Sequence, residues 1–400
     1  MKTVVQRCRS LLCWHPGWFA LAAAAALTAI GIEVIATADE AHAAKQKFWI
    51  VLSVAAFVAC LLPTSRQVGR AAYVLFAVML LLLVLMVAPG VPRMIVHVRN
   101  GARSWINLGV MNLQPSELTK IAVVLALAWY LRYRDSYRSV RGLLVPFGIV
   151  FVPVMLILKQ PDLGTAILFG PALFAMLVAA GAKLRHLAAV LMLTAVAAAL
   201  NVAVVYAMPE SMQILKAHQR TRIKAMISRA RDERRYDHSI NYQQVKAITL
   251  IGSGRVRGYG QARSKGVVRA NSLPYDYNDM IFAVVVNRWG LLGGGGVLCL
   301  FGVLVLSILS IASRAKEPFV RLVAVGFASL LFTQAAINVA ITLGLLPVTG
   351  ITLPFVSYGG SSLLTTFAML GLVINFGAYR PLLLAWPSFE HDRFDLPAPT

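Results

Sequence analysis

The sequence is poor in acidic residues and in charge generally. Its 400 residues include 16 Asp and Glu against 38 Lys and Arg, and 14% of the chain is charged while 58% is hydrophobic. This balance excludes an ordinary soluble domain, in which about a quarter of the residues carry charge. The net charge of +22 does not predict nucleic-acid binding, because no soluble nucleic-acid module surrounds the basic residues.

Cysteine is also scarce. Cys8 and Cys13 lie in the N-terminal segment, whereas Cys60 and Cys299 lie inside apolar runs. These positions match neither a disulfide framework nor a Cys/His metal site. The apolar runs do not alternate in polarity, which excludes the strands of a membrane β-barrel.

What the sequence has is long apolar runs, each near the roughly 20 residues that cross a bilayer as a helix. They predict an all-α integral membrane protein with ten transmembrane helices, at about 17–37, 47–64, 71–89, 115–131, 142–159, 165–181, 186–208, 292–313, 321–345 and 362–379. An even number of crossings puts both termini on one side. The arginine-bearing short loops fall on that side, which the positive-inside rule assigns to the cytoplasm.

The first run also resembles a signal peptide, but it is longer than the usual apolar region of about 7–15 residues. We therefore expect an uncleaved helix. The predicted membrane domain covers residues 1–386, and residues 387–400 form a short polar tail. Three outer segments remain, at about 90–114, 209–291 and 346–361.

The first outer segment ends in a pair of opposite charges. Pro115 opens a helix, where its missing N–H costs little. Glu117 and Lys120 are three residues apart and share a helix face. At the bilayer centre each would cost about 2.5–3.5 kcal/mol, so they should pair or face a polar cavity. Trp105 fits either an interface anchor or a substrate contact.

A second polar motif, residues 159–165, follows an apolar run. Asp162 is a favoured type for capping the next helix, and we consider that role ahead of catalysis. Lys159 could meet a lipid phosphate or reach the headgroups.

The third outer segment is broken by Pro347 and Pro354 and contains Gly350, Gly359 and Gly360. Irregular backbone at membrane depth is tolerated only inside protein or beside a wet cavity. Its exposed N–H groups could hold an anion. The alternative is a loop that only closes the bundle.

The long segment ends in a carboxylate, Asp279, directly before the apolar run of residues 280–286. Desolvation there would make it a stronger base than a free aspartate. The alternative is a helix cap on Asn278 or Asp279. Arg220 and Arg222 belong to a basic cluster in the same segment, which fits a solvated surface, an anionic-lipid contact or a diphosphate site.

Together these motifs resemble the SEDS family of RodA, FtsW and SpoVE. The resemblance is carried by residues 101–103, Trp105, 114–117, 160–165, 242–243, 251–254, 344–351 and 354–362. It implies ten helices and a peptidoglycan glycosyltransferase that polymerises lipid II during cell elongation or division, with the family's essential aspartate at Asp279. It also implies a divalent cation, Mg²⁺ or Mn²⁺, in many members and a class B penicillin-binding protein as partner.

The predicted substrate-binding residues come from these motifs and from the basic loop. They are Arg103, Trp105, Gln114, Ser116, Glu117, Lys120, Lys159, Gln160, Asp162, Thr165, Arg220, Arg222, Ser357, Gly359, Gly360 and Ser361.

The chain departs from the family pattern near the aspartate. Tyr275 and Tyr277 replace a glutamate and a histidine, and Asn287 and Arg288 replace a pair of glutamates. Asp276 offers a partial replacement for the lost acids. These changes keep open the hypothesis of a catalytically weakened scaffold for the penicillin-binding protein. The intramembrane polar groups and proline-broken helices keep open a second alternative, a lipid II flippase.

Overall fold

Helices make up nearly all of the computed structural model, which describes residues 15–88, 96–99, 102–107, 109, 112–207, 241–273 and 277–378. The α-helices are α2 (Gly17–Ala38), α3 (Glu40–Cys60), α4 (Ser65–Val87), α5 (Pro115–Leu131), α6 (Leu144–Lys159), α7 (Leu163–Ala180), α8 (Leu184–Ala207), α10 (Tyr242–Gly254), α11 (Gly260–Asn271), α12 (Ile281–Arg314), α13 (Pro318–Thr342) and α14 (Gly360–Ala378). Two 3₁₀ turns, Ser136–Arg138 and Arg141–Leu143, precede α6. Within the described ranges, eight helices are long and apolar enough to cross a membrane.

Local capping explains where two of these helices begin. The Asp39 carboxylate accepts hydrogen bonds from the N–H groups of Ala41 and His42, at 2.8 and 3.2 Å, and so starts α3. Thr64 starts α4 through a capping box with Gln67. Both helices therefore begin six or seven residues before the predicted starts at 47 and 71, because the apolar runs mark only their membrane portions.

The segment after α4 contains strands, so the prediction of an all-α chain was wrong here. Strands β1 (Val96–Arg99), β2 (Ala102–Asn107) and β3 (Asn112–Leu113) form an antiparallel sheet in the order β1-β2-β3. Its valine, isoleucine and tryptophan residues favour extended backbone. The Asn107 side chain accepts a 2.8 Å hydrogen bond from the N–H of Gly109, which sits at φ +79° in the following turn.

The predicted outer loop of residues 209–291 also contains regular structure. Its described part holds α10, α11 and the first turns of α12. The helix α12 begins at Ile281, not near 292, but Gly290 interrupts it with non-helical angles of φ 70° and ψ −168°. The apolar run 281–286 is therefore a short buried helix that precedes the long apolar part of α12.

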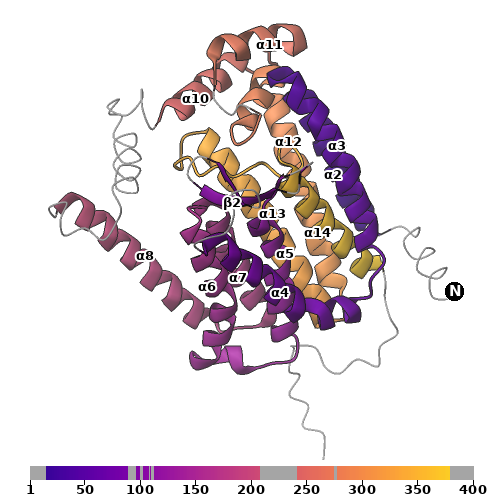
Figure 1. Ribbon diagram of the computed structural model, residues 1–400, viewed down its shortest axis with the longest axis vertical. Coiled ribbons are helices and arrows are strands. Elements are labelled where there is room, and N and C mark those ends of the chain that lie inside the picture. The colour runs from indigo at the N-terminus through magenta and orange to yellow at the C-terminus, as the bar shows by residue number, and fades with distance from the viewer. Residues whose placement is uncertain are drawn as a thin grey trace, which may run out of the picture.

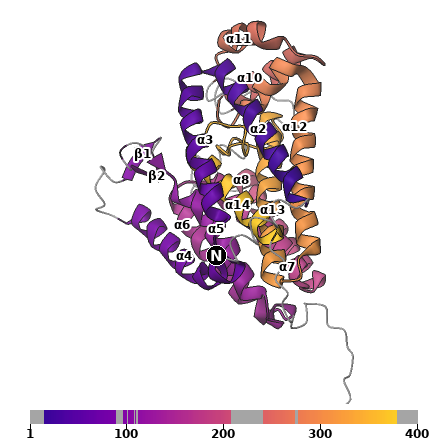
Figure 2. The same ribbon diagram turned by 90° about the vertical axis from the view of Figure 1, so that its right-hand side faces the viewer.

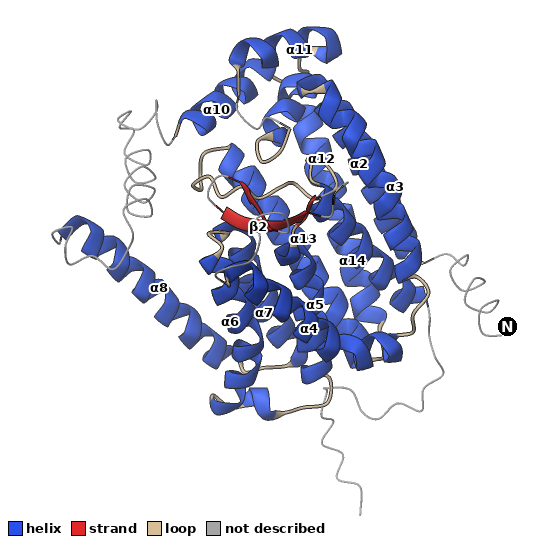
Figure 3. Cartoon of the chain, viewed as in Figure 1, coloured by secondary structure: helices blue, strands red, loops and turns tan. Residues whose placement is uncertain are grey.

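The bundle has two buried central helices and is covered at one end by two short helices (Figure 1). The helices α5 and α14 are buried along almost their whole length. Figure 1 shows α10 and α11 across the upper end of the bundle and α8 standing away from the other helices. Figure 2, turned by 90°, shows α2 beside α12 below that same end. Figure 3 shows the small sheet, in red, below α10 and α11.

Candidate functional site

Asp279 lies in a turn held by three consecutive backbone carbonyls. The carbonyl of Tyr277 accepts from the N–H of Tyr358 at 2.8 Å. The carbonyl of Asn278 accepts from the Ser357 hydroxyl at 2.6 Å, and that of Asp279 from Nδ2 of Asn338 at 2.8 Å. The turn is thus fixed to α13 and to the irregular segment before α14 without using the Asp279 carboxylate.

The Asp279 side chain is buried, with an exposed fraction of 6% for the residue. Burial raises the pKa of Asp279 from 3.8 to about 6, because the carboxylate loses hydration there and a hydrogen bond from its own backbone N–H offsets only part of that cost. The desolvation expected from the sequence is therefore confirmed. The alternative of a helix cap is not realised, since α12 begins after Met280 and no side chain caps it.

Asp162 organises a second polar cluster. Its Oδ1 accepts from the N–H of Thr165 at 3.0 Å, which confirms its expected role as the cap of α7. Its Oδ2 accepts from Gln114 Nε2 and from the Ser116 hydroxyl, both at 2.9 Å. The N–H of Gln114 in turn donates to the Ser361 hydroxyl at 3.0 Å. Four predicted site residues besides Asp162 therefore meet here, from α5, α7 and α14.

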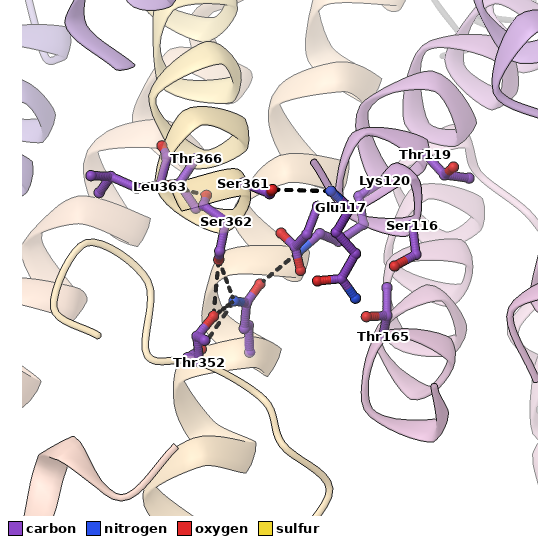
Figure 4. Close-up of polar contacts among 12 residues, drawn as sticks. Ser116, Glu117, Thr119, Lys120, Thr165, Thr352, Ser361, Ser362, Leu363 and Thr366 are labelled. Atoms are coloured by element: carbon purple, nitrogen blue, oxygen red, sulfur yellow. Dashed lines mark hydrogen bonds and ion pairs between the residues drawn. The ribbon is translucent and has the colours of Figure 1, made fainter. Parts of the chain in front are cut away.

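A third cluster surrounds the buried ion pair of α5 (Figure 4). Lys120 Nζ lies 2.7 Å from Glu117 Oε2 and donates to Oε1 of Gln334 at 3.0 Å. Gln334 donates onward to the Thr352 carbonyl at 3.0 Å, and the Thr352 hydroxyl donates to Ser362 at 2.9 Å. Lys120 is 1% exposed, so its charge is balanced inside the bundle by Glu117.

The irregular segment 344–360 joins the three clusters. It contacts α13 through Ile351 and Thr352, the Asp279 turn through Ser357 and Tyr358, and it leads into Ser361. Phe355 has φ +64° and is 2% exposed, an unusual backbone conformation for a buried aromatic residue. The segment therefore links α13, the Asp279 turn and α14 through hydrogen bonds, which suits either role expected for it, and the binding of an anion by its N–H groups stays a prediction.

The remaining predicted site residues lie in different environments. Lys159 is exposed, whereas Gln160 is 1% exposed and donates from Nε2 to the Leu83 carbonyl at 3.2 Å. Gly360 packs against Trp49 so closely that a Cβ would meet the indole ring at 1.9 Å, so this glycine serves packing. Trp105 is half-buried in β2, and Gly359 is only partly exposed. Arg220, Arg222 and the side chain of Arg103 lie outside the described residues.

An aromatic cluster beside the Asp279 turn was not predicted. The His42 ring stacks on Tyr277 with centroids 4.1 Å apart and meets Tyr358 edge-on at 4.8 Å. His42 Nδ1 lies 2.8 Å from the Asp39 carboxylate, whose pKa is lowered by this hydrogen bond. Only the Asp39–His42 spacing at the start of a helix could have indicated part of this cluster, because the two tyrosines lie far away in the sequence.

Asn287 and Arg288, which replace acids of the family pattern, make structural contacts. Arg288 forms a 2.6 Å ion pair with Glu33 of α2, and Asn287 bonds to Ser253 and Ser264 of α10 and α11. Over the described part of the chain, no three His, Cys, Asp or Glu residues form a group that could hold a metal ion.

The chain is similar to a family of cell cycle proteins. The family described as "Cell cycle protein", named for FtsW, RodA and SpoVE, matches residues 12–381. Stage V sporulation protein E of Bacillus subtilis (strain 168) is 34% identical over 311 residues, which cover 76% of this chain and 78% of that protein. A probable peptidoglycan glycosyltransferase FtsW of Trichlorobacter lovleyi is 33% identical over 368 residues, covering 88% and 91%.

Two solved structures share the fold. A chain from a structure described as "Structural coordination of polymerization and crosslinking by a peptidoglycan synthase complex" aligns with a TM-score of 0.74 and 30% identity, covering 90% of this chain and 97% of that one. The crystal structure of RodA from Thermus thermophilus aligns with a TM-score of 0.65 and 27% identity, covering 92% and 97%. These matches extend over almost the whole bundle, and the chain belongs to the SEDS family of FtsW, RodA and SpoVE.

Proposed function

We propose that this membrane protein is a peptidoglycan glycosyltransferase that polymerises lipid II into glycan strands, with Asp279 as general base. The names of its relatives support the activity. The single observation that supports the base is a buried carboxylate whose pKa is about 6, in a turn pinned only through its backbone. A base with this pKa is mostly ionised at neutral pH yet accepts a proton more readily than a free aspartate.

The proposed reaction inverts configuration at one anomeric carbon. A sugar hydroxyl of one substrate transfers its proton to the Asp279 carboxylate while its oxygen attacks the anomeric carbon of the other. The bond from that carbon to the diphosphate oxygen breaks, and undecaprenyl diphosphate leaves with the bonding electrons. A positioned base typically contributes about 10²–10⁴-fold to such a rate.

The leaving diphosphate needs positive charge that is not already neutralised. Lys120 is paired with Glu117 inside the bundle, so it contributes little net charge in this conformation. The proposed contacts are therefore Arg103, Arg220 and Arg222, which lie in the outer segments at 90–114 and 209–291.

A divalent cation fits the residues beside Asp279. Magnesium commonly uses only one or two protein carboxylates, since substrate phosphates and waters complete its shell. Oδ1 of Asn278 is buried without a hydrogen-bond partner, which leaves a neutral oxygen next to the carboxylate in sequence. Asn278 would contribute one oxygen to the shell of the ion, Mg²⁺ or Mn²⁺, which substrate phosphates and waters would complete, and the ion would supply charge that stabilises the diphosphate while Asp279 remains the base.

The setting proposed for this reaction is the bacterial inner membrane. Ten crossings, with both termini in the cytoplasm, would put the α10–α11 end and Asp279 on the outer face. The partner proposed is a class B penicillin-binding protein, in keeping with a structural relative that belongs to a peptidoglycan synthase complex.

Polymerisation by the purified protein tests the proposal. Lipid II is supplied with Mg²⁺, with and without a coexpressed penicillin-binding protein, and glycan length is measured for the wild type, Asp279→Asn and Asp279→Ala. Asp135→Asn, in the loop after α5, is a control for loss of an acid elsewhere. We expect both Asp279 variants to lose about 10²-fold or more of the rate. Wild-type yields from both would remove Asp279 from the mechanism.

The buried Glu117–Lys120 pair is the observation that favours a second function, translocation of the lipid II headgroup. Fluorescent lipid II in liposomes separates the two functions. If the protein is a flippase, the Asp279→Asn variant should still translocate the headgroup. If it is a polymerase without transport activity, the wild-type protein itself should give no translocation.

A further inference from the structure

The side-chain hydrogen bonds of Arg288 go to α2, and its guanidinium also lies 4.6 Å from the centroid of the Trp289 ring. Arg288 is 6% exposed, and its guanidinium forms a 2.6 Å ion pair with the Glu33 carboxylate. The same group donates to the Glu33 carbonyl and to the Thr37 hydroxyl, both at 2.6 Å. Figures 1 and 2 show α2 and α12 side by side at the end covered by α10 and α11. A buried arginine with three such contacts connects helices that are about 250 residues apart in the sequence.

Asn287 connects α12 to α10 and α11 through side-chain hydrogen bonds. It is fully buried, and its Nδ2 donates to the Ser253 hydroxyl at 2.8 Å and to the Leu250 carbonyl at 3.3 Å. Its Oδ1 accepts from Ser264 at 2.6 Å. This one amide therefore joins α10, α11 and α12.

Asn287 and Arg288 lie three and two residues before the break in α12 at Gly290. At this break the segment between α10 and α11 forms backbone hydrogen bonds with α12. The N–H of Tyr259 donates to the Asn287 carbonyl at 3.0 Å, and the N–H of Leu291 donates to the Arg255 carbonyl at 2.9 Å. Gly258 and Gly290 face each other with φ +74° and +70°, and a Cβ on either would meet backbone atoms at 2.3 or 2.1 Å. The junction is built for close backbone contact.

The short helix before this break is fixed at both ends. Residues 281–289 span about 12 Å at the helical rise per residue. Asp279 lies just beyond one end, pinned through Asn338 and Ser357, and Arg288 lies at the other. The residues between, 281–286, are at most 4% exposed, and close packing of this kind transmits a displacement at one end of the helix to the other.

We propose that Asn287 and Arg288 are positioning residues for Asp279, and that Arg288 requires Glu33 as its partner. They set the position of the short helix and hence of the carboxylate, and they do not contact the reacting sugars. The replacement of two acids by Asn287 and Arg288 is then a different way of anchoring the same helix, not a loss of catalytic groups. This inference rests on the proposed function of Asp279.

The test compares single and paired substitutions in the full chain. Arg288→Glu and Glu33→Arg each put two like charges together, and the double variant E33R/R288E exchanges the pair. Arg288→Lys keeps the charge without the fork of donors, and Arg257→Glu removes an exposed cation at the same end as a matched control. We expect Arg288→Glu to lower kcat about 10²-fold, as for a reacting group displaced by about 1 Å, with little change in KM.

The exchanged pair should recover kcat well above either single variant, and Arg288→Lys should lie between Arg288→Glu and the wild type. Full wild-type kcat in Arg288→Glu, or an exchanged pair no better than the singles although it elutes as a single folded species, would overturn the proposal.

A stability measurement separates this inference from the proposed function. The unfolding midpoints of Glu33→Ala, Arg288→Ala and the double alanine variant form a cycle that reports coupling without any activity. If the wild type forms no glycan, the proposed function fails and the cycle decides whether the pair exists. Non-additive midpoints support the pair, and additive midpoints refute it.

Discussion

Replacing Asp279 by asparagine should stabilise the protein at neutral pH while it lowers the rate of polymerisation about 10²-fold or more. Burial raises the pKa of Asp279 from 3.8 to about 6. A difference of about two units corresponds to roughly 3 kcal/mol, at 1.36 kcal/mol per unit. Because the folded state binds the proton more tightly than the unfolded state, stability is greatest below pH 3.8. It falls as the pH rises to 6, and above that the full cost of the buried charge applies.

The measurement is the thermal unfolding midpoint in detergent between pH 4 and pH 7.5. Asp279→Asn should raise the midpoint by a few °C at pH 7.5, and the gain should vanish toward pH 4. Asp162→Asn is the matched control and should lower the midpoint, because the Asp162 carboxylate accepts from Gln114, Ser116 and Thr165. An Asp279→Asn protein no more stable than the wild type at pH 7.5, or a gain that is independent of pH, would refute this account of the buried charge.

Three further outcomes are expected. The kcat/KM of polymerisation should rise with pH through about 6 as Asp279 loses its proton, and a profile flat between pH 5 and pH 7 would contradict the assignment of the base. Lys120→Met should destabilise the protein by about 3–5 kcal/mol, since it leaves Glu117 buried without its cation, and adding Glu117→Leu should restore most of the unfolding midpoint. Gly290→Ala should reduce the yield of monodisperse protein on gel filtration, whereas Gly295→Ala, in the same helix with nothing within 4 Å, should not.

The sequence predicted the helices whose ends carry a clear local signal. The predicted bounds 115–131 of α5 are those of the structure, because Pro115 marks the first turn and the charged Arg132 follows the apolar run. The starts of α3 and α4 were missed because polar first turns outside the membrane interior carry no apolar signal. The helix at 281–289 was assigned to a loop because only Gly290, one residue among several glycines, separates it from the membrane helix that follows.

The candidate site was predictable where its residues lie in one motif. Asp162 as a cap and Glu117 with Lys120 as a pair follow from spacing alone. By contrast, the sequence indicated only that Arg288 replaces an acid of the family pattern. Its partner Glu33 is 255 residues away in the chain, and no local pattern links the two residues. Contacts such as that of His42 with Tyr277 depend on how the helices meet, so no local pattern contains them.

The acids of this end of the bundle show why Asp279 differs from the others. Glu117 is buried beside the Lys120 ammonium, and the Asp162 carboxylate accepts three hydrogen bonds from other residues, so both carboxylates have polar partners. At Asp279 the donors of other residues bond to the backbone carbonyls of residues 277, 278 and 279, and the carboxylate accepts from its own backbone N–H. The turn is thereby as well fixed as the other two sites, while its carboxylate keeps the desolvation that raises its pKa to about 6. If Asp279 is the base we propose, a further donor to its carboxylate would make the fold more stable and the base weaker, so a turn fixed through its backbone carbonyls is the arrangement that suits proton abstraction.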